Sequence, residues 1–295
     1  MAYFYLMLAL FAGIAKGYCG KTVSSDMGNF KECVFINLVR MLFSAILGLL
    51  LVLLKTGTSG FVITQEGFCI YLLAAISMSV FCVAWMYAYQ NEAYMFLSIF
   101  TMMGTVFTCL LDTVFYSVNI KLSQWFGMAI LLLAVFIMSI YNKDIKGKPT
   151  VKGLIILIVG SIGSSLADFS QKIYTREIGQ SAEIFNFYMY AFSFVLLAIV
   201  YVSLKRKKST GVSHKIYDKK HILIYFAMAF FLYMNSVTKT MSATFLSSAQ
   251  IYPVLQGANL ILSAIMAHVM FKEKINIKGL VGIVIAFVGL MLIYI

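Results

Sequence analysis

The sequence predicts an all-α integral membrane protein with ten transmembrane helices. Three observations support this fold class: 62% of the 295 residues are hydrophobic, only 12% are charged, and the mean hydropathy is +0.92. Soluble domains carry about 25% charged residues, so this much apolar surface requires a lipid solvent. The apolar runs are continuous over roughly 20 residues, which favours membrane helices over the alternating strands of a β-barrel.

The expected spans are separated by short loops, without a large aqueous domain. The first apolar run has neither a basic leading region nor a small-residue cleavage site, so we expect a retained span and not a signal peptide. The ten expected spans are approximately 2–20, 33–54, 67–90, 94–116, 122–141, 152–174, 184–204, 221–240, 244–271 and 277–294.

The second half of the chain repeats the first. Segments 93–116 and 242–265 both contain Phe-Leu-Ser near the helix start, and both lead through a polar loop and a glycine into an aliphatic helix. We therefore expect two five-helix repeats, residues 1–148 and 149–295. Because five is odd, the second repeat enters the membrane from the opposite side, and the repeats are inverted. Inverted repeats are typical of secondary transporters, whose substrate site lies near the midplane.

Polar side chains recur every three or four residues along three of the spans, so that they share one helix face. Because a polar face in lipid is costly, we expect each stripe to line a cavity. For any single serine or threonine, a hydrogen bond to a neighbouring helix is the alternative. The stripes are Ser98, Thr101, Thr105, Thr108 and Asp112; Ser161, Ser164 or Ser165, Asp168 and Gln171; and Tyr252, Gln256, Asn259 and Ser263.

The candidate substrate-binding residues come from these stripes and from spans two and three. Span three presents an aromatic face, which suits cation–π contact with a substrate or simple packing. Arg40 in span two could bind a carboxylate or phosphate, or pair with Asp26 or Glu32. The charge of the substrate therefore stays open. The candidates are Arg40, Trp85, Tyr89, Thr101, Thr105, Gln250, Tyr252, Gln256 and Asn259.

Three residues are candidates for driving transport. Pro253 cannot donate a backbone hydrogen bond, which frees a carbonyl one turn earlier and makes it a candidate hinge. Asp112 and Asp168 are carboxylates well inside spans, and intramembrane acids often carry a coupling proton. The alternative is that each pairs with a base, Asp168 with Lys172 one turn away.

The end of the second half carries a proline followed by a hydrophobic residue early in span nine, a glutamate after that span, and a glycine that opens span ten. With the ten spans and the duplication, these features give a chain that resembles the EamA-type members of the drug/metabolite transporter superfamily. The resemblance implies a transporter with a cavity lined by spans 1, 3, 4, 6, 8 and 9, and it implies no particular substrate. The first half departs from the pattern, with glycine in the place of the proline. The residues concerned are Pro253, Val254, Glu273, Gly279, the lysines Lys21 and Lys172 after the first span of each half, and Gly104.

We expect a secondary active transporter that moves a small organic metabolite, such as an amino acid or amine, by alternating access through a midplane cavity. The alternatives are a flippase for a lipid-linked substrate, another non-transporting membrane protein, or a channel. An enzyme is not expected, because no histidine lies with an acid at catalytic spacing. Neither a cofactor nor a metal is expected.

The expected partners are a lipid bilayer and a small-molecule substrate. We expect a monomer or homodimer in a prokaryotic plasma membrane. The net charge of +12 is attributed to basic cytoplasmic loops and not to nucleic-acid binding. The distribution of basic residues places both termini outside the cell, whereas the family resemblance implies that both lie inside.

Overall fold

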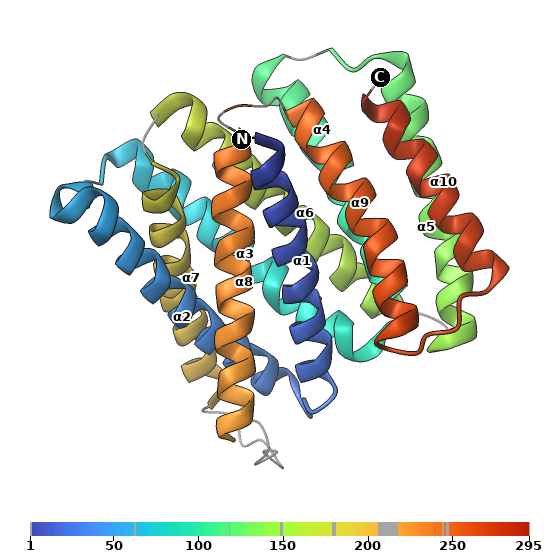
Figure 1. The fold of residues 1–295 in the computed structure, drawn as a ribbon, viewed down its shortest axis with the longest axis horizontal. Coiled ribbons are helices and arrows are strands. Elements are labelled where there is room, and N and C mark those ends of the chain that lie inside the picture. Colours follow the sequence, from blue (N-terminus) through green and yellow to red (C-terminus); the bar gives the residue numbers. More distant parts are fainter. Residues whose placement is uncertain are drawn as a thin grey trace.

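The fold is known from a computed structural model, which describes residues 2–61, 63–117, 119–147, 150–178, 181–205, 218–243, 245 and 248–294. Within these ranges the chain forms ten α-helices and no strand (Figure 1). The helices are α1 Ala2–Ser24, α2 Phe30–Thr56, α3 Gln65–Asn91, α4 Tyr94–Tyr116, α5 Leu122–Ile145, α6 Val151–Ile173, α7 Ala182–Lys205, α8 Lys219–Ala243, α9 Ser248–Val269 and α10 Ile277–Tyr294.

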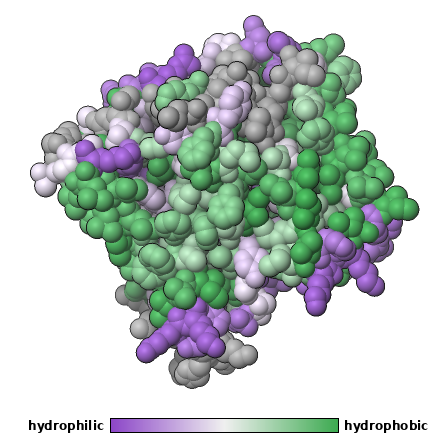
Figure 2. All heavy atoms as spheres, in the orientation of Figure 1, coloured by the Kyte–Doolittle hydropathy of each residue, from purple (hydrophilic) through white to green (hydrophobic). Residues whose placement is uncertain are grey.

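Eight of the described helices, α1 to α8, are long and apolar enough to cross a bilayer. The apolar parts of the other two that were assessed, Leu255–Val269 and Ile277–Ile293, are shorter. Figure 2 shows apolar residues over the middle of the visible face and hydrophilic residues gathered toward its two ends. This distribution fits a helical membrane protein, while the count of ten spans stays a prediction for α9 and α10.

Polar residues in the loops set where several helices begin. Asn29 caps α2 by accepting a hydrogen bond from the Glu32 N–H at 3.0 Å. Thr64 and Thr150 cap α3 and α6 in the same way. Each cap satisfies one of the backbone donors that a helix start leaves free. The helices therefore begin within a few residues of their predicted starts.

Three pairs of corresponding helices, α2 with α7, α4 with α9 and α5 with α10, pack against each other with their ends reversed. Gly127 near the start of α5 faces Gly289 near the end of α10: a Cβ atom at Gly127 would lie 2.6 Å from the Gly289 carbonyl oxygen. Lys55 at the end of α2 pairs with Glu183 at the start of α7. The first turn of α4 contacts Glu273, which follows α9. In these three pairs the two helices thus run in opposite directions.

The other large contacts join helices of the two halves that do not correspond to each other. Helix α3 of the first half packs against α6 of the second, and α1 packs against α8. Between these pairs, α4 contacts α9 and α6, and α9 contacts α1. Both termini lie at the same end of the bundle (Figure 1). Helices of both halves therefore surround the centre, where the polar stripes meet.

Two details differ from the sequence-based expectations. The ninth helix runs from Ser248 to Val269, shorter than the predicted 244–271, because the chain turns at Met270 and Phe271 before Glu273. The expected boundary between the repeats, near residue 148, lies outside the described residues and stays a prediction.

Candidate functional site

A cavity lies at the centre of the bundle, between α1, α3 and α4 of the first half and α6, α7, α8 and α9 of the second. Its volume is about 150 Å³, counted as the space open to the centre of a water molecule. One water needs roughly 10–15 Å³ on that measure, so the cavity has room for about ten waters. That space suits a small organic molecule better than a single ion.

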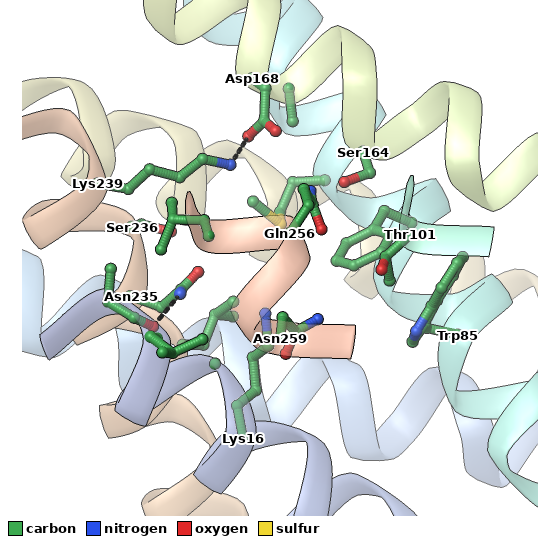
Figure 3. Close-up of a pocket in the computed structure, with 18 of the residues that line it drawn as sticks. Lys16, Trp85, Thr101, Ser164, Asp168, Asn235, Ser236, Lys239, Gln256 and Asn259 are labelled. Carbon is green, nitrogen blue, oxygen red and sulfur yellow. Dashed lines mark hydrogen bonds and ion pairs between the residues drawn. The ribbon is translucent and has the colours of Figure 1, made fainter. Parts of the chain in front are cut away.

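The polar stripes of three helices meet in this cavity. Thr101 of α4, Ser164 and Asp168 of α6, and Gln256 and Asn259 of α9 all line it, and Figure 3 shows their side chains around one space. The amides of Gln256 and Asn259 therefore face the cavity and not lipid. This arrangement gives hydrogen-bond donors and acceptors from both halves of the chain to one ligand.

The aromatic face of α3 forms one wall of the cavity. Phe81, Trp85 and Tyr89 line it at intervals of four residues. The rings of Phe81 and Trp85 pack with their centroids 5.1 Å apart. Trp85 is 5% exposed, so its indole is held rigidly beside the cavity and presents a large, fixed apolar surface.

The acid of α6 is paired, but its partner is not the predicted one. Asp168 accepts a hydrogen bond from the Lys239 ammonium of α8 at 2.5 Å (Figure 3). Lys172, which the sequence offered as an alternative partner, makes no ion pair with Asp168; its ammonium lies 5.2 Å from the centroid of the Tyr116 ring. The ion pair joins two cavity-lining helices of the second half, with both side chains less than one-fifth exposed.

Sequence reasoning missed several cavity residues on α1 and α8. Lys16 lines the cavity from α1, and Asn235, Ser236 and Lys239 line it from α8. The Asn235 amide donates to the carbonyl oxygen of Ala9 at 2.6 Å, which ties α8 to α1. The two lysines could have been found, because both lie inside predicted spans, where a base is as exceptional as an acid.

Arg40 lies beside the cavity and not on its main wall. It lines a small recess that shares Lys16, Trp85 and Tyr89 with the cavity. The two carboxylates expected as partners are engaged elsewhere: Asp26 contacts His221 at 3.1 Å, and Glu32 accepts from the Gly28 N–H at 2.7 Å. The nearest polar contact of Arg40 is the Asn37 side chain at 3.4 Å, so neither expected ion pair forms.

The other candidate residues lie outside the part of the chain whose side chains the structure describes. They stay predictions: Thr105, Asp112, Gln250, Tyr252 and Pro253.

Some members of the stripes hold helices together. The Ser161 hydroxyl donates to the Phe100 carbonyl oxygen at 2.8 Å, and the Ser165 hydroxyl donates to that of Gly104 at 2.7 Å. A Cβ atom at Gly104 would lie 3.1 Å from the Ser165 oxygen, so this glycine lets α4 and α6 approach. Hydrogen bonds of this kind are common between membrane helices. Ser164, adjacent in sequence, is the serine that faces the cavity.

One end of the bundle is tied by charged side chains around the loop between α3 and α4. The Lys21 ammonium donates to the carbonyl oxygens of Tyr89 and Glu92. Burial raises the pKa of Glu92, while a hydrogen bond from Asn142 and the charge of Lys21 oppose that rise. The Glu273 carboxylate accepts from the Tyr94 N–H at 2.7 Å. Since residue 93, the N-cap of α4, is an alanine without a side-chain cap, this carboxylate supplies the missing acceptor.

A family model described as an EamA-like transporter family matches residues 2–140 and again residues 151–295. The chain belongs to the EamA-like transporter family. A search of curated proteins finds no match to the chain. Members of the family are membrane transporters, so the EamA-like chain is a multi-pass membrane protein.

The ion pair of this EamA-like protein should contribute to its stability. Replacing Asp168 by Asn, or Lys239 by Met, should lower the free energy of unfolding, because a charged side chain inside the bundle loses its counter-charge. The double variant should recover most of the loss, with a coupling energy of about 1–3 kcal/mol. Thermal unfolding of the four proteins in detergent measures this coupling.

The exposed pair of Asp144 and Lys278, at 2.7 Å, is the matched control. Its coupling should stay within about 1 kcal/mol, because water screens surface ion pairs. Equal coupling for the two pairs would contradict the role given to Asp168 and Lys239.

Proposed function

We propose that this protein is a secondary active transporter that carries a small organic metabolite by alternating access through the central cavity. The observation that supports this most strongly is that helices of both halves line the cavity. Side chains from α1, α3 and α4 face side chains from α6, α8 and α9. A ligand held there would contact both halves of the chain at once.

Antiparallel pairing of corresponding helices supports the mechanism. The pairs α2–α7, α4–α9 and α5–α10 each join one helix of the first half to its counterpart in the second. Inverted halves can exchange conformations, so that the site opens first to one side of the membrane and then to the other. Gly127 and Gly289 hold α5 and α10 in close contact, and we propose that the two halves rotate relative to each other about this contact.

The contacts of Asp168 suggest how transport would be coupled to a proton gradient. Its carboxylate lines the cavity and holds the Lys239 ammonium. A proton taken up by the carboxylate would cancel its charge and release the lysine, changing both the charge of the cavity and the link between α6 and α8. Protonation and substrate binding would then favour different conformations, which is the requirement for coupling. Asp112 remains a second candidate for this role.

Substrate counterflow tests the proposed function. Purified protein is reconstituted into liposomes loaded with one metabolite of a panel, and uptake of the same labelled metabolite is followed. A transporter should give saturable uptake that is accelerated by the internal substrate, because the loaded cavity returns faster than the empty one. Uptake that neither saturates nor exchanges indicates a channel. Movement of a labelled lipid-linked substrate, without counterflow of any metabolite, indicates a flippase.

Replacement of Asp168 by Asn tests the coupling proposal. An inwardly directed proton gradient should stimulate net uptake by the wild type. In Asp168→Asn, the increase in uptake rate caused by the gradient should be at least tenfold smaller, while counterflow continues. Asp144→Asn, at an exposed carboxylate far along α5, should keep the stimulation. Full stimulation of the Asp168→Asn variant would rule out this residue as the coupling group.

A further inference from the structure

Two cationic side chains beside the cavity have no counter-charge among the residues that the structure describes. Lys16 lies two-thirds of the way along α1 and lines both the cavity and the recess. Arg40 lies in α2, is 5% exposed and lines the same recess. A charge inside the bilayer is costly unless it is paired or faces water. The question is therefore what neutralises these two side chains.

The described residues provide no carboxylate for either cation. Lys16 has no ion pair there, and its ammonium lies 5.7 Å from the centroid of the Phe81 ring. Arg40 makes one long contact, to Asn37, and its buried Nε has no hydrogen-bond partner among the described residues. Asp168 is the one acid among the described cavity-lining residues, and it is paired with Lys239.

The sizes of the two spaces decide where a counter-charge could bind. The recess has a volume of about 10 Å³, room for no more than a single water. The neighbouring cavity is about 150 Å³ on the same measure, and Lys16 lines both. An anionic group large enough to be a substrate therefore fits on the cavity side of Lys16, with Arg40 behind it. In Figure 3, Lys16 extends from α1 toward Asn259 and the centre of the cavity.

The same arrangement disfavours a cationic substrate. An aromatic wall can attract a cation, but Lys16 already lies over the face of Phe81. A second cation at this wall would meet the positive charges of Lys16 and Arg40 in a medium of low dielectric constant, where like charges repel strongly. Phe81 and Trp85 then serve as an apolar surface for the uncharged part of the ligand.

We propose that the substrate of this transporter is a small organic anion with an apolar or aromatic body. Its carboxylate or phosphate group binds the Lys16 ammonium, and Arg40 adds positive charge from the recess. The apolar body packs against Phe81 and Trp85, while Gln256 and Asn259 of α9 bind its uncharged polar groups. The proposal rests on the proposed transport function, because it assumes that the cavity is the substrate site.

The first test needs no knowledge of the substrate. If Lys16 has no counter-charge in the empty protein, Lys16→Met removes an unfavourable buried charge, and the variant should unfold at a higher temperature than the wild type. A lysine that holds the fold together would give the opposite result. The control is Lys278→Met, which removes an exposed lysine paired with Asp144 and should lower the unfolding temperature slightly or leave it unchanged. A lower unfolding temperature for Lys16→Met would overturn the proposal.

The second test compares ligands that share one body. Phenylacetate, phenyl phosphate, phenylacetamide and phenethylamine are added to purified protein at fixed ionic strength, and the shift in unfolding temperature is measured. At least one of the two anions should stabilise the wild type more than the amide or the amine does. The stabilisation should be lost in Lys16→Met, fall in Arg40→Met and persist in Lys278→Met. Equal or greater stabilisation by the amide or amine, no stabilisation by either anion, or anion stabilisation that survives Lys16→Met would overturn the proposal.

Counterflow separates a failure of this inference from a failure of the transport function. If phenethylamine exchanges across liposomes and the anions do not, the transport function stands and the anion site is refuted. If the anions stabilise the protein through Lys16 but neither they nor any metabolite exchanges, the anion site stands and the transport function is refuted.

Discussion

The cost of placing polar groups in hydrocarbon is the constraint on which this structure depends. A membrane helix can hide its backbone polar groups internally, but each buried amide, hydroxyl or charge needs a partner or water. The protein meets this demand in two ways. Some hydroxyls, such as those of Ser161 and Ser165, bond to a neighbouring helix. Others, with the amides of Gln256 and Asn259, turn toward one central cavity. The cavity gathers polar side chains from both halves of the chain, which makes it the natural site for a ligand.

Both halves of the duplicated chain contribute side chains to the wall of this cavity. Three pairs of equivalent helices lie antiparallel, and Gly127 and Gly289 let α5 and α10 approach closely. A contact of the second half also reaches into the first half. Glu273 accepts hydrogen bonds from the first turn of α4, so a residue of one half completes a helix start in the other. These bonds tie the two halves at one end of the cavity. At the same end, Lys21 bonds to the end of α3 and the loop after it, within the first half.

Much of this arrangement is readable in the sequence because it follows from periodicity. The length of each apolar run predicts a helix, and intervals of three and four residues predict which face is polar. The prediction fails where the answer depends on the distance between helices. Ser164 and Ser165 fit the same stripe, yet one residue rotates a side chain by about 100°, and only the packing of α4 on α6 shows that Ser165 bonds to Gly104. Asp168 pairs with Lys239, 71 residues away, and no local pattern could have chosen that partner over Lys172. Lys16 belongs to no stripe of polar residues, so the periodicity that marks the other cavity residues does not mark it.

A central substrate cavity requires that the polar face of α9 borders water while its other face borders lipid. Reaction of introduced cysteines with a charged, membrane-impermeant thiol reagent tests this most directly, in a protein whose native cysteines have been replaced by serine or alanine. Asn259→Cys, on the cavity wall, should react rapidly in reconstituted protein. Ile261→Cys, two residues away on an exposed apolar position, should react many times more slowly, because a thiol in hydrocarbon is neither ionised nor reached by the reagent. Equal rates, or faster reaction at residue 261, would contradict the central cavity and the transport function that follows from it.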